Sequence, residues 1–224
     1  HLGFALDRKG GQLSLYDRDG SLIDSVEFGP QLPNLAIGRT GPDGEWRLAI
    51  PTFGFANLAQ PLGDPSAVRI NEWLAEAEVL FDRDFIELYN PGDGPVDVGG
   101  FYLTDRPMVR PDKYRIAALS FVEGRGFAVF AADGEESLGH VGFKLSPDGE
   151  MIGLFDRDLK EVDKVLFGPQ TPDVSQGRAP DGSDRLGWLE LPTPGMSNPV
   201  RRELVATRIV LVPEEADKRV IIPA

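Results

Sequence analysis

Apolar and polar residues alternate with a period of two along much of this chain, and the alternation predicts β-strands. Ile152 and Leu154 share one parity within 150–155, and Leu13 and Leu15 hold the same places within 11–16. This pattern is typical of a strand with one buried face. Further strands are predicted at residues 85–89, 100–103, 126–130 and 162–167. Short strands separated by Gly, Pro and Asp-rich turns indicate an all-β sandwich or barrel.

One segment conflicts with this pattern. Residues 71–80 are rich in Glu, Ala and Leu, and Ile70, Leu74 and Ala77 would share one face of a helix. We expect a strand followed by a loop here, with a helix as the alternative. Residues 58–67, which contain Pro61, Gly63 and Pro65, are predicted to be a linker, and residues 199–224 a further linker or the start of another domain. Two short strands are predicted in that last segment, at 207–212 and 219–222.

An internal repeat organises the chain. When residues 1–39 are aligned with residues 140–178 without a gap, 18 of 39 positions are identical, among them the run FGPQ at 28–31 and 167–170. After a three-residue insertion the match resumes and ends at Asn57 and Asn198. We therefore expect the two stretches to share one backbone.

The first copy begins at its equivalent of residue 140. We accordingly expect residue 1 to lie inside a domain of a longer protein, so that residues 1–57 form the carboxyl-terminal half of one domain and residues 68–198 a complete copy. Half a sandwich exposes strand edges and an apolar face. The half copy is therefore expected to pack against the complete domain, against residues 199–224, or against another molecule by strand exchange.

Composition excludes several functions. The net charge of -13 disfavours nucleic acid as a partner, because the phosphate backbone requires a basic surface. The chain has no Cys and only two His residues, which excludes thiolate and multi-histidine metal sites. No apolar run is long enough to span a membrane as a helix. No nucleophile elbow, phosphate loop or zinc-binding helix motif is present, and no carboxylate pair stands out, so we expect no enzyme activity.

Residues 68–198 resemble the lamin tail domain family in its bacterial form. The resemblance rests on the order and spacing of several motifs: Ile70-Asn71-Glu72, Phe85-Ile86-Glu87-Leu88-Tyr89-Asn90-Pro91, Val96 to Asp105, Phe143-Lys144-Leu145-Ser146, Gly177-Arg178, and Pro192-Thr193-Pro194-Gly195-Met196-Ser197-Asn198. It implies an immunoglobulin-like β-sandwich with a non-catalytic role as a structural or interaction module of a larger, exported protein, outside the cell or at its surface. The implied partner is a protein or a surface polymer. The alternative function is an accessory domain that binds polysaccharide for an attached extracellular enzyme.

Two aspartate–arginine pairs recur in both copies. Asp24 and Asp163 share the parity of apolar strand neighbours and are expected to point inward, where a carboxylate requires a partner. Arg39 and Arg178 supply a guanidinium suited to that role. We predict structural ion pairs between Asp24 and Arg39 and between Asp163 and Arg178; in the alternative, both aspartates face water in a turn.

Clustered aspartates also suggest calcium as a candidate cofactor. The candidate ligands are Asp17, Asp19, Asp24, Asp156, Asp158 and Asp163, because hard cations prefer grouped oxygen ligands. The loops lack the glutamate of a full calcium loop. A hairpin turn with solvated aspartates explains the same residues.

Aromatic and sulfur side chains suggest a contact face. Met151 and Phe155 have the parity predicted to face outward, and together with Trp73 and Trp188 they would form a sugar-binding or protein-binding surface. For both tryptophans the competing interpretation is core packing. His1 and His140 precede the same Gly-Phe-x-Leu run in each copy, and we interpret them as capping or packing residues.

Overall fold

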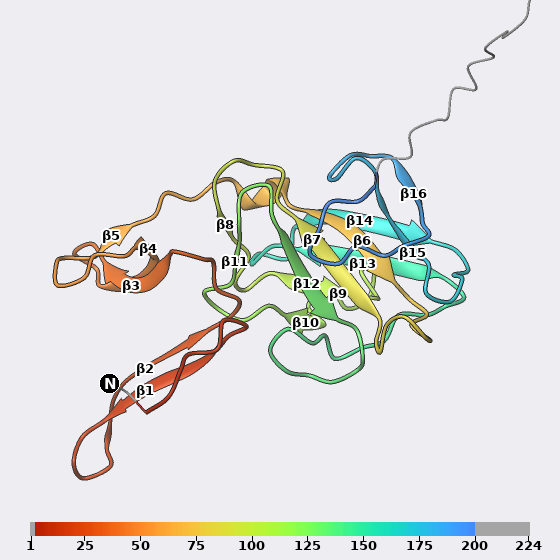
Figure 1. Cartoon of the computed structure of the whole chain (residues 1–224). Helices are drawn as coiled ribbons and strands as arrows, with labels where there is room; N and C mark the ends of the chain where they lie inside the picture. Colours follow the sequence, from red (N-terminus) through yellow and green to blue (C-terminus); the bar gives the residue numbers. More distant parts are fainter. Residues whose placement is uncertain (1–2, 200–224) are drawn as a thin grey trace, which may run out of the picture.

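The computed structural model describes residues 3–199 of the chain (Figure 1). These residues contain strands and one short 3-10 turn, η1 (Pro65–Ala67), and no α-helix, so the fold is all-β as expected. No helix in the described range is long and apolar enough to cross a lipid bilayer. The strands in chain order are β1 (Gly11–Tyr16), β2 (Leu22–Phe28), β3 (Ala36–Thr40), β4 (Glu45–Ile50), β5 (Leu58–Ala59), β6 (Arg69–Leu74), β7 (Phe85–Tyr89), β8 (Val96–Asp97), β9 (Tyr102–Thr104), β10 (Tyr114–Arg115), β11 (Phe121–Val122), β12 (Phe127–Ala131), β13 (Glu150–Phe155), β14 (Glu161–Phe167), β15 (Ser175–Arg178) and β16 (Leu186–Leu189).

Residues 68–198, here called the core domain, form a sandwich-like pair of antiparallel sheets. One sheet has the strand order β12-β7-β6-β15-β16 and the other β10-β9-β13-β14, with β8 and β11 as a separate short pair. Both sheets contribute to one apolar core, in which Ile70, Leu88, Leu103, Ile152 and Leu154 are fully enclosed. Burying that shared core is the main stabilising contribution to this part of the chain.

The ambiguous segment contains strand β6, which ends at Leu74 and is followed by an irregular stretch, as predicted. Helix propensity loses here because β6 lies between β7 and β15 and is buried on both faces. Ile70 and Trp73 contact the apolar core, whereas Asn71 and Glu72 are buried among polar groups. A bulge at Asn71 breaks the alternation that the sequence pattern assumes.

Residues 3–59 form two small sheets that do not pair with those of the core domain. One is the β1–β2 hairpin and the other is β3-β4-β5, and both extend away from the core domain (Figure 1). The contact with the core domain is made near Gly29–Gln31. Gly29 N donates to Ala118 O at 2.9 Å, and Gln31 Nε2 donates to Leu119 O at 3.1 Å.

The two aligned hairpins pair in the same register. Leu15 lies opposite Asp24 in β1–β2, and Leu154 lies opposite Asp163 in β13–β14. In both hairpins the register shifts one residue later, at Tyr16 and at Phe155. The two hairpins thus have the same strand pairing, bulge included.

The segments predicted to be linkers differ partly from the expectation. Leu58 and Ala59, assigned to a linker by their sequence, form β5 and pair with Ile50 and Ala49 of β4. The remaining stretch to residue 67 contains the turn η1, capped by the Asp64 side chain, which accepts a hydrogen bond from Ser66 N. The strands predicted at 207–212 and 219–222 lie outside the described residues.

Candidate functional site

An ion pair between β14 and β15 holds the backbone of β6. Arg178 Nη2 lies 3.1 Å and 3.0 Å from the two carboxylate oxygens of Asp163. Asp163 Oδ2 accepts the Ile70 N–H at 2.8 Å, and Arg178 Nε donates to Ile70 O, also at 2.8 Å. The two charged side chains expose only 7% and 12% of their surface. The pair thus satisfies both backbone groups of Ile70.

An asparagine completes this clamp on β6. Asn198 Nδ2 donates to Arg178 O at 2.9 Å and to Asn71 O at 3.3 Å. It lies so close to β15 that a Cβ at Gly177 would stand 2.7 Å from Asn198 Nδ2, which explains glycine at this position. We call Asp163, Arg178 and Asn198 the clamp residues.

Two buried glutamates on neighbouring strands are the strongest electrostatic feature of the core domain. Glu72 of β6 accepts hydrogen bonds from Ser175 Oγ, from Thr193 N at 3.0 Å and from Thr193 Oγ1 at 3.1 Å. Glu87 of β7 accepts the Gly195 N–H at 2.6 Å. Loop 191–198 is therefore fastened to the sheet through carboxylates. Sequence reasoning missed both glutamates, although each stands in a strand otherwise dominated by apolar residues.

Burial strongly perturbs these carboxyl groups. Loss of solvation raises the pKa of Glu87 to about 8, against the opposing effect of the hydrogen bonds from Asn71 and Gly195. The pKa of Glu72 is also raised, again chiefly by burial. Perturbed carboxyl groups of this kind occur at catalytic sites and in structural networks. Here both are fully buried beneath loop 191–198 and bonded to its backbone, which indicates a structural role.

Asn71 joins the glutamates to the turn after β15. Its Nδ2 donates to Glu87 Oε1 and to Asp181 Oδ1, both at 3.0 Å, and its Oδ1 accepts the Gly182 N–H at 3.0 Å. Asp181 Oδ1 in turn accepts the Asn198 N–H. The motif Asn71-Glu72 therefore bonds to two loops that both belong to the carboxyl-terminal half of the core domain.

Residues 3–57 keep the clamp without a strand in it. Arg39 Nη2 lies 2.8 Å from Asp24 Oδ1, which places the second predicted ion pair within bonding distance. Asn57 Nδ2 donates to Arg39 O at 3.0 Å, as Asn198 does to Arg178. However, the Arg39 and Asp24 side chains are 47% and 42% exposed, so the inward orientation expected for Asp24 is not found. The physical reason is that no counterpart of β6 covers this pair within the described residues.

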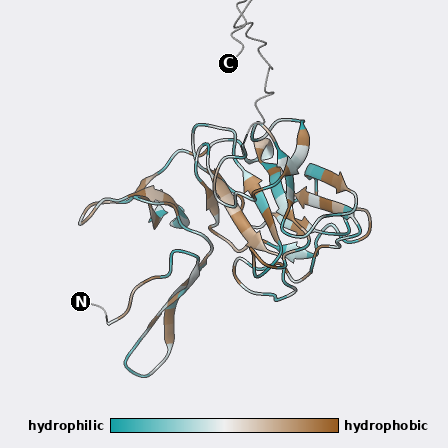
Figure 2. Cartoon of the chain, turned by 45° about the vertical axis from the view of Figure 1, so that its right-hand side comes forward, coloured by the Kyte–Doolittle hydropathy of each residue, from teal (hydrophilic) through white to brown (hydrophobic). Residues whose placement is uncertain are grey.

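The same contrast holds for apolar residues of the two hairpins. Leu13 and Leu15 expose 39% and 58% of their surface, whereas their counterparts Ile152 and Leu154 expose none. The exposed residues whose counterparts form the apolar core of the core domain or pack against it, here called the open face, are Phe4, Leu6, Leu13, Leu15 and Ile23. Figure 2 shows hydrophobic residues along the projecting β1–β2 hairpin. Contiguous exposed apolar surface of this kind marks a site of association.

The aspartates considered for calcium organise hairpin turns. Asp17 Oδ1 accepts the N–H groups of Asp19 and Ser21, and Asp156 Oδ1 accepts those of Asp158 and Lys160. These bonds are typical of Asx turns. The remaining two candidates, Asp24 and Asp163, belong to the ion pairs already described. The hairpin-turn interpretation accounts for the geometry of both loops.

Another group of ligand atoms comes together at a different place. Within residues 3–199, Asp133, Glu135 and His140 are the His, Asp and Glu residues whose ligand atoms gather within 4.8 Å. The His140 ring nitrogen Nδ1 lies 2.7 Å from Asp133 Oδ2, and Arg83 Nη1 lies 3.3 Å from the same oxygen. Arg83 and His140 thus already engage the Asp133 carboxylate. The contact between His140 and Asp133 lies within the segment that follows β12. His1, the repeat equivalent of His140, lies outside the described residues.

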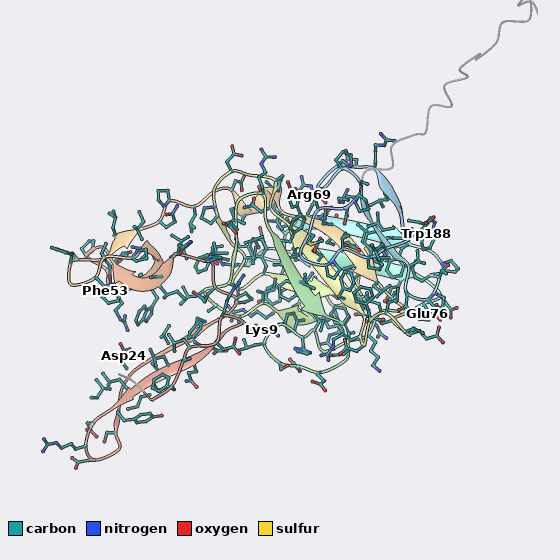
Figure 3. All side chains as sticks on the ribbon, viewed as in Figure 1. Lys9, Asp24, Phe53, Arg69, Glu76 and Trp188 are labelled. Carbon is teal, nitrogen blue, oxygen red and sulfur yellow. The ribbon has the colours of Figure 1, made fainter. Side chains whose placement is uncertain are left out.

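The proposed contact face does not form. Trp73 is completely buried and packs 5.6 Å from the Phe167 ring between centroids, so core packing is correct for this tryptophan. Phe155 is also buried, although it lies outside the apolar core: its ring and Pro107 each stand 2.8 Å from where a Cβ on Gly153 would lie, so the segment near Pro107 covers this face of β13. Met151 is half-buried on β13, and Trp188 is exposed on β16 of the other sheet (Figure 3). The four side chains therefore do not share one surface.

Comparisons with known proteins complete the description of the site. No protein-family model, no curated protein and no solved structure matches this chain.

Proposed function

We propose that this chain is a non-catalytic interaction module of a larger, exported bacterial protein. In this proposal the core domain is a lamin-tail-type, immunoglobulin-like sandwich, and residues 1–57 are half of a second unit of the same kind. The sequence resemblance of residues 68–198 and the 18 identities between residues 1–39 and 140–178 support it. The extracellular location follows from the resemblance.

One observation carries the proposal: the open face is apolar and uncovered within the described residues. Leu15 exposes 58% of its surface at the position where Leu154 exposes none. Exposed apolar side chains destabilise a protein in water relative to a state in which a partner buries them. The function that best fits this surface is association with another polypeptide segment.

The buried glutamates support the non-catalytic part of the proposal. A catalytic carboxylate requires access to a substrate, whereas Glu72 and Glu87 are fully enclosed and bonded to loop 191–198. Their bonds join the two halves of the core domain. We assign to them the role of fastening a loop to a sheet.

A dye-binding experiment tests the open face as a contact surface. We expect the intact chain to enhance the fluorescence of an anionic naphthalene dye that binds exposed apolar surface. The double substitution Leu13→Ser with Leu15→Ser should reduce this signal by about half or more, because it removes two side chains from the middle of the open face. Leu186→Ser is the matched control, since Leu186 is exposed on β16, outside the open face. Equal dye binding by the double variant and the intact chain would contradict the proposed function.

A further inference from the structure

We propose that residues 11–57 are an acceptor for a strand pair of the β6–β7 type, with Asn-Glu on the first strand and Glu on the second. The assigned occupant is a polypeptide segment patterned like residues 68–139, which supply this strand pair to residues 140–198 in the core domain. This inference rests on the proposed function and names the partner of the open face.

The Asp–Arg pair of the clamp recurs in residues 11–57. In the core domain, Asp163 and Arg178 bond the N–H and the carbonyl oxygen of Ile70 in β6. Asp24 and Arg39 hold the same repeat positions; Asp24 lies on β2, which pairs with β1 in the register of β14 with β13, and Arg39 Nη2 lies 2.8 Å from its carboxylate. An occupant strand placed as β6 is would therefore meet a donor and an acceptor already oriented toward each other.

Residues 11–57 also contain counterparts of the groups that bond the side chains of β6 and β7 in the core domain. Thr193 and Gly195 donate to Glu72 and Glu87 in the core domain. Their counterparts are Thr52 and Gly54, in the same Pro-Thr-x-Gly arrangement. Thr52 Oγ1 lies 3.4 Å from Asn57 Oδ1, as Thr193 Oγ1 lies 2.9 Å from Asn198 Oδ1.

Asp43 supports the same assignment. It occupies the Pro-Asp-Gly position of Asp181, which bonds Asn71 in the core domain. One donor differs, because Ala36 stands where Ser175 donates to Glu72. An occupant glutamate would thus receive one hydrogen bond fewer than Glu72 does.

The repeat contains more acceptor halves than donor halves. The sequence contains two acceptor halves, 1–57 and 140–198, and one donor half, 68–139. In the structure the donor half pairs with 140–198 through β6–β15 and β9–β13. Strand exchange between identical copies would cover one acceptor half only by uncovering another. Exchange between copies of residues 3–199 therefore leaves as many acceptor halves uncovered as before.

Polar groups at the acceptor also select the occupant. A purely apolar strand would leave the Thr52 N–H and the Gly54 N–H without the carboxylates that their counterparts bond, and an unpaired buried donor is unfavourable. A strand pair with Asn-Glu and Glu satisfies these groups while its other face covers Leu13 and Leu15. The acceptor thus distinguishes its occupant by polar as well as apolar contacts.

A fusion tests the assignment directly. A second copy of residues 68–139 is joined through Gly139 to His1 of the full chain, with no linker, which reproduces the junction between Gly139 and His140. We expect the backbone amides of β1 and β2 to exchange with solvent at least about 100-fold more slowly in the fusion than in the original chain, because the hairpin then lies in a sandwich. The matched control is the same fusion with Ile70→Asp and Leu88→Asp in the added copy only, and we expect no added protection from it.

Clamp substitution provides an independent readout. Arg39→Ala should increase exchange at β1 and β2 in the fusion and leave it nearly unchanged in the original chain, where no strand of the described residues lies in the clamp. A merely local role of Arg39 would give equal effects in both backgrounds.

A peptide experiment covers the case in which the added segment does not fold. Unlabelled peptide spanning residues 64–92 is titrated into the isotope-labelled full chain. We expect saturable chemical-shift changes at Gly38, Arg39 and Asn57 with the signals of β13 and β14 unchanged. Peptides with Asn71→Ala and Glu72→Ala should bind at least about tenfold more weakly, since each good hydrogen bond contributes about a factor of ten.

The outcomes distinguish the two proposals. Unchanged exchange in the fusion together with no shifts on peptide addition overturns the assigned occupant. Shifts confined to β13 and β14 overturn it as well, because the peptide would then compete for the other half. If the dye still binds the open face in either case, the contact surface stands and only the occupant is wrong.

Discussion

The β1–β2 and β13–β14 hairpins have closely related sequences and the same register, yet their side chains have opposite environments. Leu154 is enclosed by two sheets, whereas Leu15 projects into water. The Asp163–Arg178 pair clamps Ile70, whereas the Asp24–Arg39 pair clamps nothing among the described residues. Local sequence therefore specifies the hairpin, its bulge and its turn. Burial depends on the strand pair that packs against it.

The clamp provides the largest expected contrast. Arg178→Ala leaves Asp163 buried without its partner and removes a donor to Ile70 O, which should lower the free energy of unfolding by about 3–5 kcal/mol. Arg39→Ala should lower it by at most about 1 kcal/mol, because its pair is nearly half exposed. Urea denaturation of the two variants measures both values. Equal losses would show that Arg39 already holds a buried partner.

The paired leucines give the next contrast. Leu154→Ala opens a cavity in the shared core and should cost about 2–5 kcal/mol of stability. Leu15→Ala should change the stability by about 0.5 kcal/mol or less, because the side chain is exposed. Thermal and urea unfolding of both variants provide the comparison. A loss above about 2 kcal/mol at Leu15 would contradict its exposed position.

The buried glutamates predict an unusual pH dependence of the core domain. The folded-state pKa of Glu87 is raised to about 8 from an ordinary 4.5, so the folded state binds this proton more tightly than the unfolded state. The resulting stabilisation is complete below pH 4.5 and is lost as the pH rises through about 8. Glu72, whose pKa is also raised, acts in the same direction.

Glu87→Gln isolates this effect. The variant should lose on the order of 1 kcal/mol or more of the stability change between pH 5 and pH 8, because the titrating group is gone. Glu27→Gln, an exposed glutamate on β2, is the control and should keep the full pH dependence. Urea midpoints at four or five pH values suffice. A stability of the original chain that rises across this range would contradict the assignment.

The smallest expected contrast lies in the loops before β15 and β3. Asp173 accepts the N–H groups of Glu78, Val79 and Leu80, and these bonds lower its pKa. Asp173→Asn introduces the residue found at the equivalent position, Asn34, and should shift the urea midpoint modestly downward at pH 7. The difference should vanish as the pH falls below 3.8, because protonation removes the same charge. A shift that persists at low pH would assign the effect to shape instead of charge.

The sequence predicted the strands well and the site only in part. Alternation located β7, β13 and β14, and the aspartate–arginine pairs followed from their parity and repetition. The same rule predicted an exposed Phe155, but the segment near Pro107 covers the face of β13 that carries Gly153 and Phe155. Alternation carries no information about which loop covers the outer face of a strand.

The glutamate network could not be derived from local pattern. Glu72 and Glu87 bond Thr193 and Gly195, which lie more than a hundred positions away in the sequence. Only the fold brings these groups together. The available signal was a charged residue in the middle of an otherwise apolar strand, which indicates a buried carboxylate with partners supplied from elsewhere.

Hydrogen exchange of the unmodified chain compares the covered and the uncovered hairpin in one sample. Amides of β13 and β14 should exchange only when the core domain unfolds, whereas those of β1 and β2 should exchange through local opening, at rates faster by about 100-fold or more. Equal protection of the two hairpins would show that β1–β2 is already covered, and the open face would then not exist in the unmodified chain.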